Sequence, residues 1–199
     1  MFGKTLTIGN ISTLLFSSSS KFTFQNERLQ KAVTLYEEAN ELSSQKQLED
    51  ASYCYMQGIF LGRKAVQELV QNQERKQDGG DGDGCCEDDD PQLGLEWMVA
   101  SYLSCSKIHI ELEDWNTARS DAWAACSYSQ NENLEALECM LTVCKQTNDI
   151  FNELQTLNLI LQLLRSGDTS VATRKFTLDT IQEQIMEVEE KLEEKFNNS

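Results

Sequence analysis

Apolar residues recur at steps of three and four along most of the chain, which is the spacing of one face of an α-helix. A clear example is the stripe formed by Leu29, Ala32, Val33 and Tyr36. Short polar segments separate such stripes, so we predict an all-α fold of short antiparallel helices. The predicted helices cover residues 29–42, 48–69, 97–112, 115–128, 134–144, 151–164 and about 173–196.

Two segments interrupt the helical pattern. Residues 1–25 are rich in Ser and Thr and contain no acidic residue, and we interpret them as a disordered or targeting tail. Residues 77–91 are rich in Gly and Asp, a composition that cannot bury enough apolar area to fold. We therefore predict one helical domain, residues 26–199, with a solvated acidic loop inserted at 77–91.

The helices also repeat as pairs with small residues at matching places. One pair ends in a helix that begins with Trp115 and carries Ala118, and an earlier pair carries Ala51 in the equivalent position. Ala51 and Ala118 are 67 residues apart, which we interpret as one repeat lengthened by the acidic insertion. A third pair begins at Asn133 and keeps the large positions but loses the small ones.

Three short motifs resemble the tetratricopeptide repeat (TPR) domains of large immunophilins and related co-chaperones. The opening of their first repeat resembles residues 37–42 here, Glu37-Glu38-Ala39-Asn40-Glu41-Leu42. The end of their second repeat resembles Ala122-Trp123-Ala124-Ala125, and the opening of their third repeat resembles Asn133-Leu134-Glu135-Ala136-Leu137. The resemblance covers about residues 26–196. It implies a TPR-like α-solenoid of three helical hairpins and a long C-terminal capping helix.

The same resemblance implies a peptide-binding groove. These co-chaperones clamp the C-terminal carboxylates of heat-shock chaperones with two asparagines and three basic side chains. The matching positions here are Tyr36, Asn40, Ser104, Glu135 and Cys139, so only one asparagine is kept and all three basic side chains are lost. We therefore predict a groove that binds a protein or peptide partner, with binding of chaperone tails as the alternative.

Charge and cysteine content narrow the partners and the compartment. Lys and Arg total 17 against 33 Asp and Glu, a net charge of −16, which disfavours nucleic acid and anionic membrane surfaces. The seven cysteines form no C-x-x-C pair and lie mostly in helical patterns, as expected for reduced thiols in the cytoplasm. Targeting to an organelle through residues 1–25 is the alternative localisation.

Catalysis and metal binding have no support in the motifs. The single histidine, His109, falls at a large packing position of its helix, and the three tryptophans, Trp97, Trp115 and Trp123, fall where side chains pack between helices. We expect all four to be structural. No cofactor or metal site and no catalytic residue is predicted, so the function expected is that of a non-enzymatic adaptor.

The last predicted helix has a heptad seam. Its apolar residues step by three and four, and they are Leu178, Ile181, Ile185, Val188 and Leu192. The first half of this helix is predicted to cover the last hairpin, as terminal caps do in repeat proteins, and its second half, from Glu187 to Lys195, to project into solvent. Weak self-association through this helix is the alternative.

Overall fold

The computed structural model describes residues 22–77, 89–166 and 176–197, and every regular element in these ranges is an α-helix. The prediction of an all-α fold is confirmed. The helices are α1 (Glu27–Ser44), α2 (Leu48–Gln77), α3 (Pro91–Glu111), α4 (Trp115–Tyr128), α5 (Leu134–Gln146), α6 (Ile150–Arg165) and α7 (Leu178–Asn197).

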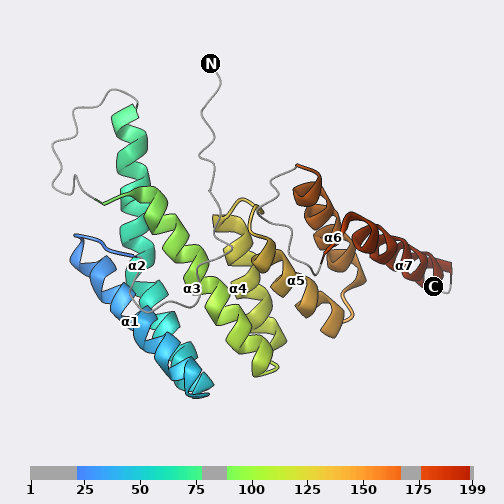
Figure 1. The fold of residues 1–199 in the computed structure, drawn as a ribbon, viewed down its shortest axis with the longest axis horizontal. Helices are drawn as coiled ribbons and strands as arrows, with labels where there is room; N and C mark the ends of the chain where they lie inside the picture. The colour runs from blue at the N-terminus through green and yellow to red at the C-terminus, as the bar shows by residue number, and fades with distance from the viewer. Residues whose placement is uncertain (1–21, 78–88, 167–175, 198–199) are drawn as a thin grey trace.

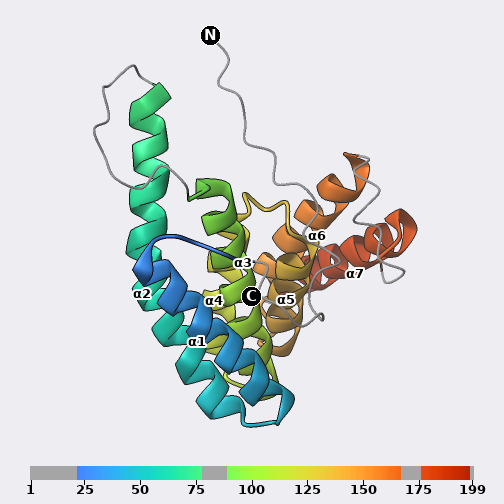
Figure 2. The ribbon, with the colours of Figure 1, turned by 60° about the vertical axis from the view of Figure 1, so that its left-hand side comes forward.

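Each helix packs mainly on the helices next to it in the sequence. The most extensive contacts join α1 to α2 and α3 to α4, and further contacts join each remaining pair of neighbours and also α3 to α5. The helices therefore follow one another across the molecule, with α1 and α2 at one end and α7 at the other (Figure 1). The turned view in Figure 2 shows α1 and α2 side by side in front of the remaining helices.

The turns within the three hairpins have the same backbone design. In each of them one residue has a left-handed backbone, namely Lys46, Glu113 and Asn148, with φ angles of 61°, 57° and 52°. In each of them the next residue donates its backbone N–H to a carbonyl five residues back, with N–O distances of 2.9–3.0 Å. The first two of these turns are 67 residues apart and the last two are 35 residues apart. The turn between α4 and α5 has the same hydrogen bond, from Asn131 to Cys126 at 2.8 Å, but two left-handed residues, Gln130 and Asn131.

Helix starts are fixed by side-chain caps. The caps of α1, α3, α4, α5 and α6 accept backbone N–H groups of the first turn, as Asn and Asp typically do, and they are Asn26, Asp90, Asp114, Asn133 and Asp149. Pro91 is the first residue of α3, where its fixed φ suits a helix start. The predicted acidic loop of 77–91 is therefore helical at both of its ends, since α2 extends to Gln77.

Asp89 corrects the expectation that the whole acidic segment is solvated. Its side chain is buried, and its two carboxylate oxygens accept the backbone N–H groups of Gln25 and Asn26 at 2.5 and 2.8 Å. This contact ties the residues before α1 to the start of α3. Residues 78–88, which make up the rest of the predicted loop, lie outside the described residues.

A close approach between helices α2 and α3 is built around Gly62. The ring of Trp97 is fully buried, and a Cβ placed on Gly62 would lie 2.4–2.5 Å from two of its carbon atoms. Only a residue without a side chain lets the two helices pack this closely around the indole ring. The prediction that Trp97 is a packing residue is consistent with this position.

Helix α7 lies against α6, and its heptad seam is partly used for this contact. Ile181 and Val188 are buried, while Leu178 at the start of the seam is 44% exposed. The second half of α7 was expected to project into solvent, but Val188 shows that the contact continues into it. Val188 belongs to the same cluster of buried side chains as Leu157 and Ile160 of α6.

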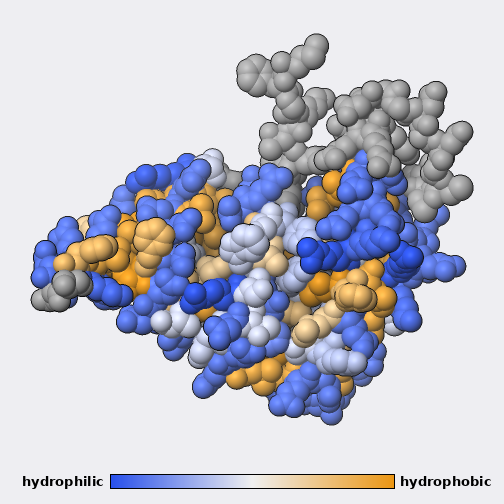
Figure 3. All heavy atoms as spheres, turned by 180° about the vertical axis from the view of Figure 1, so that it is seen from behind, coloured by the Kyte–Doolittle hydropathy of each residue, from blue (hydrophilic) through white to orange (hydrophobic). Residues whose placement is uncertain are grey.

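Apolar surface remains in separate patches between hydrophilic ones, as the space-filling view shows (Figure 3). Trp123 is 66% exposed, so the expectation that all three tryptophans pack between helices is wrong for this one. On α2, Tyr53, Met56 and Phe60 are exposed on one side of the helix. None of the helices in the described ranges has both the length and the apolar character needed to cross a membrane.

Candidate functional site

The five positions singled out from the sequence come from three helices and meet on one face of the molecule. Tyr36 and Asn40 belong to α1, Ser104 to α3, and Glu135 and Cys139 to α5. The side chains of Ser104 and Asn40 lie near the Tyr36 phenol and lower its pKa, whereas burial, which has the largest effect, and the charge of Glu135 raise it. We call the face defined by Tyr36, Asn40, Ser104, Glu135 and the lysine described below the candidate face.

Tyr55 of α2 joins this group, although sequence reasoning gave it no role beyond packing. Its hydroxyl donates to Asn40 Oδ1 at 2.5 Å, and its ring lies 5.5 Å from that of Tyr36 between centroids. Burial raises the pKa of both phenols above the ordinary value of 10.0. Both tyrosines therefore stay neutral at physiological pH, and, being buried, they support the candidate face from beneath without adding charge to it.

Lys107 is the basic residue that sequence reasoning missed. It lies on α3 three residues after Ser104, hence on the same side of the helix, and forms an ion pair with Glu135 of α5. Both side chains are partly exposed, at 39% and 35%. The pair presents one positive and one negative group at the surface, with no net charge of its own.

Cys139 lies beneath this ion pair. The thiol is buried, and this burial is the main reason that its pKa is raised to about 11. The Ser106 side chain lies near the thiol and donates to the carbonyl oxygen of Ala118 at 3.0 Å. A protonated, buried thiol is a poor nucleophile, so Cys139 acts here as a packing residue under the candidate face.

A second polar group surrounds the only histidine. His109 Nε2 lies 2.7 Å from Ser52 Oγ, and His109 Nδ1 lies 2.8 Å from Asp121 Oδ2. The three residues belong to α3, α2 and α4, so the imidazole links three helices. Sequence reasoning expected a packed histidine, which its buried position confirms, but could not name its two partners.

The order Ser–His–Asp is that of a hydrolase triad, and its surroundings decide what it can do. Ser52 is buried within α2, beyond the first turn, where backbone N–H groups are used by the helix itself. A hydrolase also needs free donors beside the serine to stabilise an oxyanion. The geometry therefore supports a structural link between helices.

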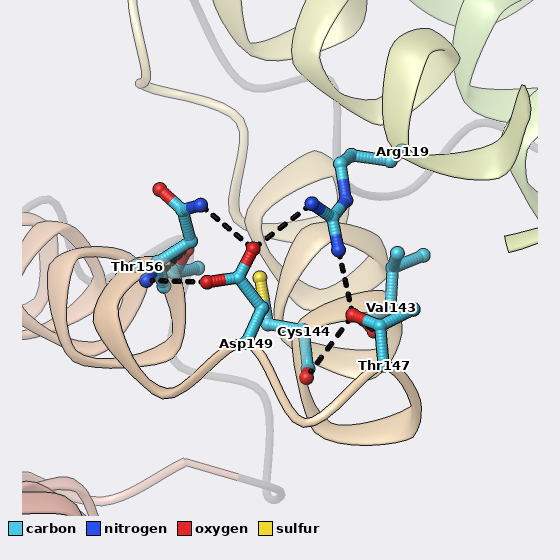
Figure 4. Close-up of polar contacts among 7 residues, drawn as sticks. Arg119, Val143, Cys144, Thr147, Asp149 and Thr156 are labelled. Carbon is cyan, nitrogen blue, oxygen red and sulfur yellow. Dashed lines mark hydrogen bonds and ion pairs between the residues drawn. The ribbon is translucent and has the colours of Figure 1, made fainter. Parts of the chain in front are cut away.

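A third polar group fastens α4 to the turn between α5 and α6 (Figure 4). Arg119 donates to Asp149 Oδ2 at 2.9 Å and to Thr147 Oγ1 at 2.6 Å. Asp149 also accepts from the Asn152 side chain at 2.8 Å, and this bond is the largest cause of its lowered pKa. The group holds α5, and with it Glu135, in a fixed relation to α4.

The five cysteines in the described ranges are all free thiols, and four of them are buried. Burial raises the pKa of Cys126 to about 12 and that of Cys144 to about 11. Within the same ranges no three His, Cys, Asp or Glu side chains come close enough together to hold a metal ion. Neither any family model nor any curated protein matches this sequence.

Proposed function

We propose that this chain is a non-enzymatic adaptor with a TPR-like fold of three helical hairpins and a capping helix. Its candidate face would form a groove that holds a peptide or a helix of a partner protein. The three hairpin turns of one design, two of them spaced by 35 residues, support a repeat of TPR length. The free thiols are compatible with work in a reducing compartment such as the cytoplasm.

The observation that carries the proposal is the meeting of polar side chains from α1, α3 and α5. Tyr36 contacts Asn40 on its own helix and Ser104 on α3, and Lys107 of α3 is paired with Glu135 of α5. Hydroxyl, amide and charged groups of this kind can hydrogen-bond the backbone and side chains of an extended peptide. Side chains that serve packing alone would not need this polar character.

The charge balance indicates what kind of peptide would bind. The chain carries a net charge of −16, and the lysine on the candidate face is already paired with a carboxylate. A partner with net positive charge would be attracted to such a surface, and an acidic one repelled. The acidic tails of heat-shock chaperones, the alternative ligand, are therefore the less favoured class.

The test is a selection of random peptides on the full-length chain, followed by affinity measurements. We expect basic peptides to be enriched. We expect Ser104→Trp, which fills the candidate face, to weaken them by about tenfold or more, or about 1.4 kcal/mol. Asn158→Trp is the control, since Asn158 is exposed on α6 and bonds only to Leu154 of its own helix.

Two results would contradict the proposal. Peptides that bind the Ser104→Trp variant as tightly as the parent would place the binding site elsewhere. Micromolar binding of an acidic chaperone-tail peptide, weakened by Lys107→Ala, would favour the co-chaperone alternative. In that case Lys107 would replace the basic clamp residues that this sequence lacks at Tyr36, Glu135 and Cys139.

A further inference from the structure

The first described residues of the chain already lie on the candidate face. The ring of Phe22 packs edge-on against that of Tyr36, with 6.1 Å between ring centroids and an angle of 87° between the planes. Phe24 is buried in the same core cluster. The segment before α1 therefore contacts a residue that the proposed ligand would have to reach.

The direction of this segment follows from its anchors. Asp89 holds the backbone of Asn26 at the start of α1, and the Gln30 side chain donates to the carbonyl oxygen of Phe24 at 2.8 Å. Tyr36 lies ten residues after Asn26, or about 15 Å along the helix. Phe22 lies four residues before Asn26, which spans about 14 Å when extended. Going backwards from Asn26, the chain therefore runs along α1 toward Tyr36.

We propose that residues 4–21 continue along this line and occupy the candidate face of their own chain. Asn40 is one helical turn beyond Tyr36 on α1, and the Ser104 side chain of α3 lies near the Tyr36 phenol. The inference rests on the proposed function, because it makes the amino-terminal segment the internal competitor of the partner peptide.

The chemistry of the segment fits this role. Residues 1–26 contain Lys4 and Lys21 and no acidic residue, whereas residues 27–199 carry all 33 Asp and Glu and the other 15 of the 17 Lys and Arg, a net charge of −18. The segment thus has the positive charge that the candidate face favours in a partner. It also offers four consecutive serine hydroxyls, at residues 17–20, next to its anchor.

Tethering makes even a weak contact effective. A short flexible link gives an effective concentration on the order of 1 mM. A segment whose own Kd is about 100 μM would then leave the face free about a tenth of the time, and an external peptide would bind about tenfold more weakly than to a free face. Weakening the tethered segment should recover this factor.

The experiment places a photo-crosslinking residue, p-benzoylphenylalanine, at Ser104 of the full-length chain and at Asn158 as the control. After irradiation, mass spectrometry should find products between position 104 and residues 4–21, and none from position 158. In a mixture of chains labelled with two nitrogen isotopes, products should join segments of the same label. Products that join different labels would show exchange between molecules and overturn the inference.

Charge reversal provides the second arm. Lys4→Glu with Lys21→Glu should at least halve the product at position 104 and raise the affinity of a selected external peptide up to about tenfold. The control is Lys64→Glu with Lys191→Glu, which makes the same charge change at exposed positions of α2 and α7 and should have neither effect.

The two proposals fail in different ways. If selected peptides bind at the candidate face but position 104 gives no product with residues 4–21, the amino-terminal occupant is wrong and the adaptor function stands. If the intrachain product forms but no external peptide binds even after charge reversal, the occupant is correct and the adaptor function is wrong.

Discussion

Replacement of Gly62 by alanine tests the close contact between helices α2 and α3 around the Trp97 ring. On helix propensity alone the change should stabilise α2 by about 1 kcal/mol. The new methyl group, however, would lie 2.4 Å from the Trp97 ring, which is fully buried and has no solvent to move into. Moving the ring to a normal carbon–carbon distance requires a shift of about 1 Å.

The steric effect should outweigh the propensity. Overpacking a well-filled core costs about 1–3 kcal/mol, and a displaced indole belongs at the upper end of that range. We expect Gly62→Ala to lower the free energy of unfolding by about 2 kcal/mol, as the difference between a cost of about 3 and a gain of about 1. Urea unfolding followed by circular dichroism measures it, and an unchanged m-value would show that only stability has changed.

A double-mutant cycle with Trp97→Leu separates the two effects. Trp97→Leu alone should destabilise the protein, since it empties part of the core. In that background Gly62→Ala should lose most of its steric cost, with only the Cβ of Ala32 still near at 3.3 Å, and should stabilise by up to about 1 kcal/mol. The reasoning would be refuted if Gly62→Ala destabilised both backgrounds equally, or if it did not destabilise the parent.

Three further predictions concern the polar groups and the cap. Asp121→Ala should cost about 1–3 kcal/mol in urea unfolding because it leaves the buried His109 Nδ1 without its partner, and Ser52→Ala added to it should cost less than it does alone. The pKa of Asp149 is lowered from 3.8 in the folded chain, so the carboxylate stabilises the fold above pH 3.8 and this stabilisation is lost as the pH falls below that value. The Asp149→Asn variant should therefore lose less stability in acid than the parent, as measured by unfolding at several pH values. Truncation after residue 170 should give aggregated protein by size-exclusion chromatography, whereas truncation after residue 190 should not, because Ile181 and Val188 are then retained.

The helices could be predicted from the sequence because each one is specified locally. The three-and-four spacing of apolar residues and the capping Asn and Asp side chains lie within a few residues of the structure that they determine. Trp123 is a residue whose exposure such local patterns do not predict. A tryptophan at a helical position suggests burial, but its exposure depends on whether another helix covers that side of α4.

The candidate site was less accessible to sequence reasoning, for a similar reason. Lys107 pairs with a residue of α5, and Tyr55 and Ser52 meet partners 15 and 57 residues away. Such pairs depend on how the helices are stacked, which no local pattern specifies. Tyr36, Asn40 and Ser104 were expected to lie together only from the resemblance, since no local pattern links α1 with α3.

The division of the core has a consequence for how the chain opens. One cluster of buried side chains gathers around α1, α2 and α3, and another gathers around α4 to α7. Helix α3 couples the two, because its Tyr102 contacts both clusters, its Leu103 belongs to the second, and the helix packs extensively on α4. Helix α7, in contrast, packs mainly on α6, so it can open without disturbing this central contact. Amide hydrogen exchange should then show a lower free energy of opening for α7 than for α3 and α4.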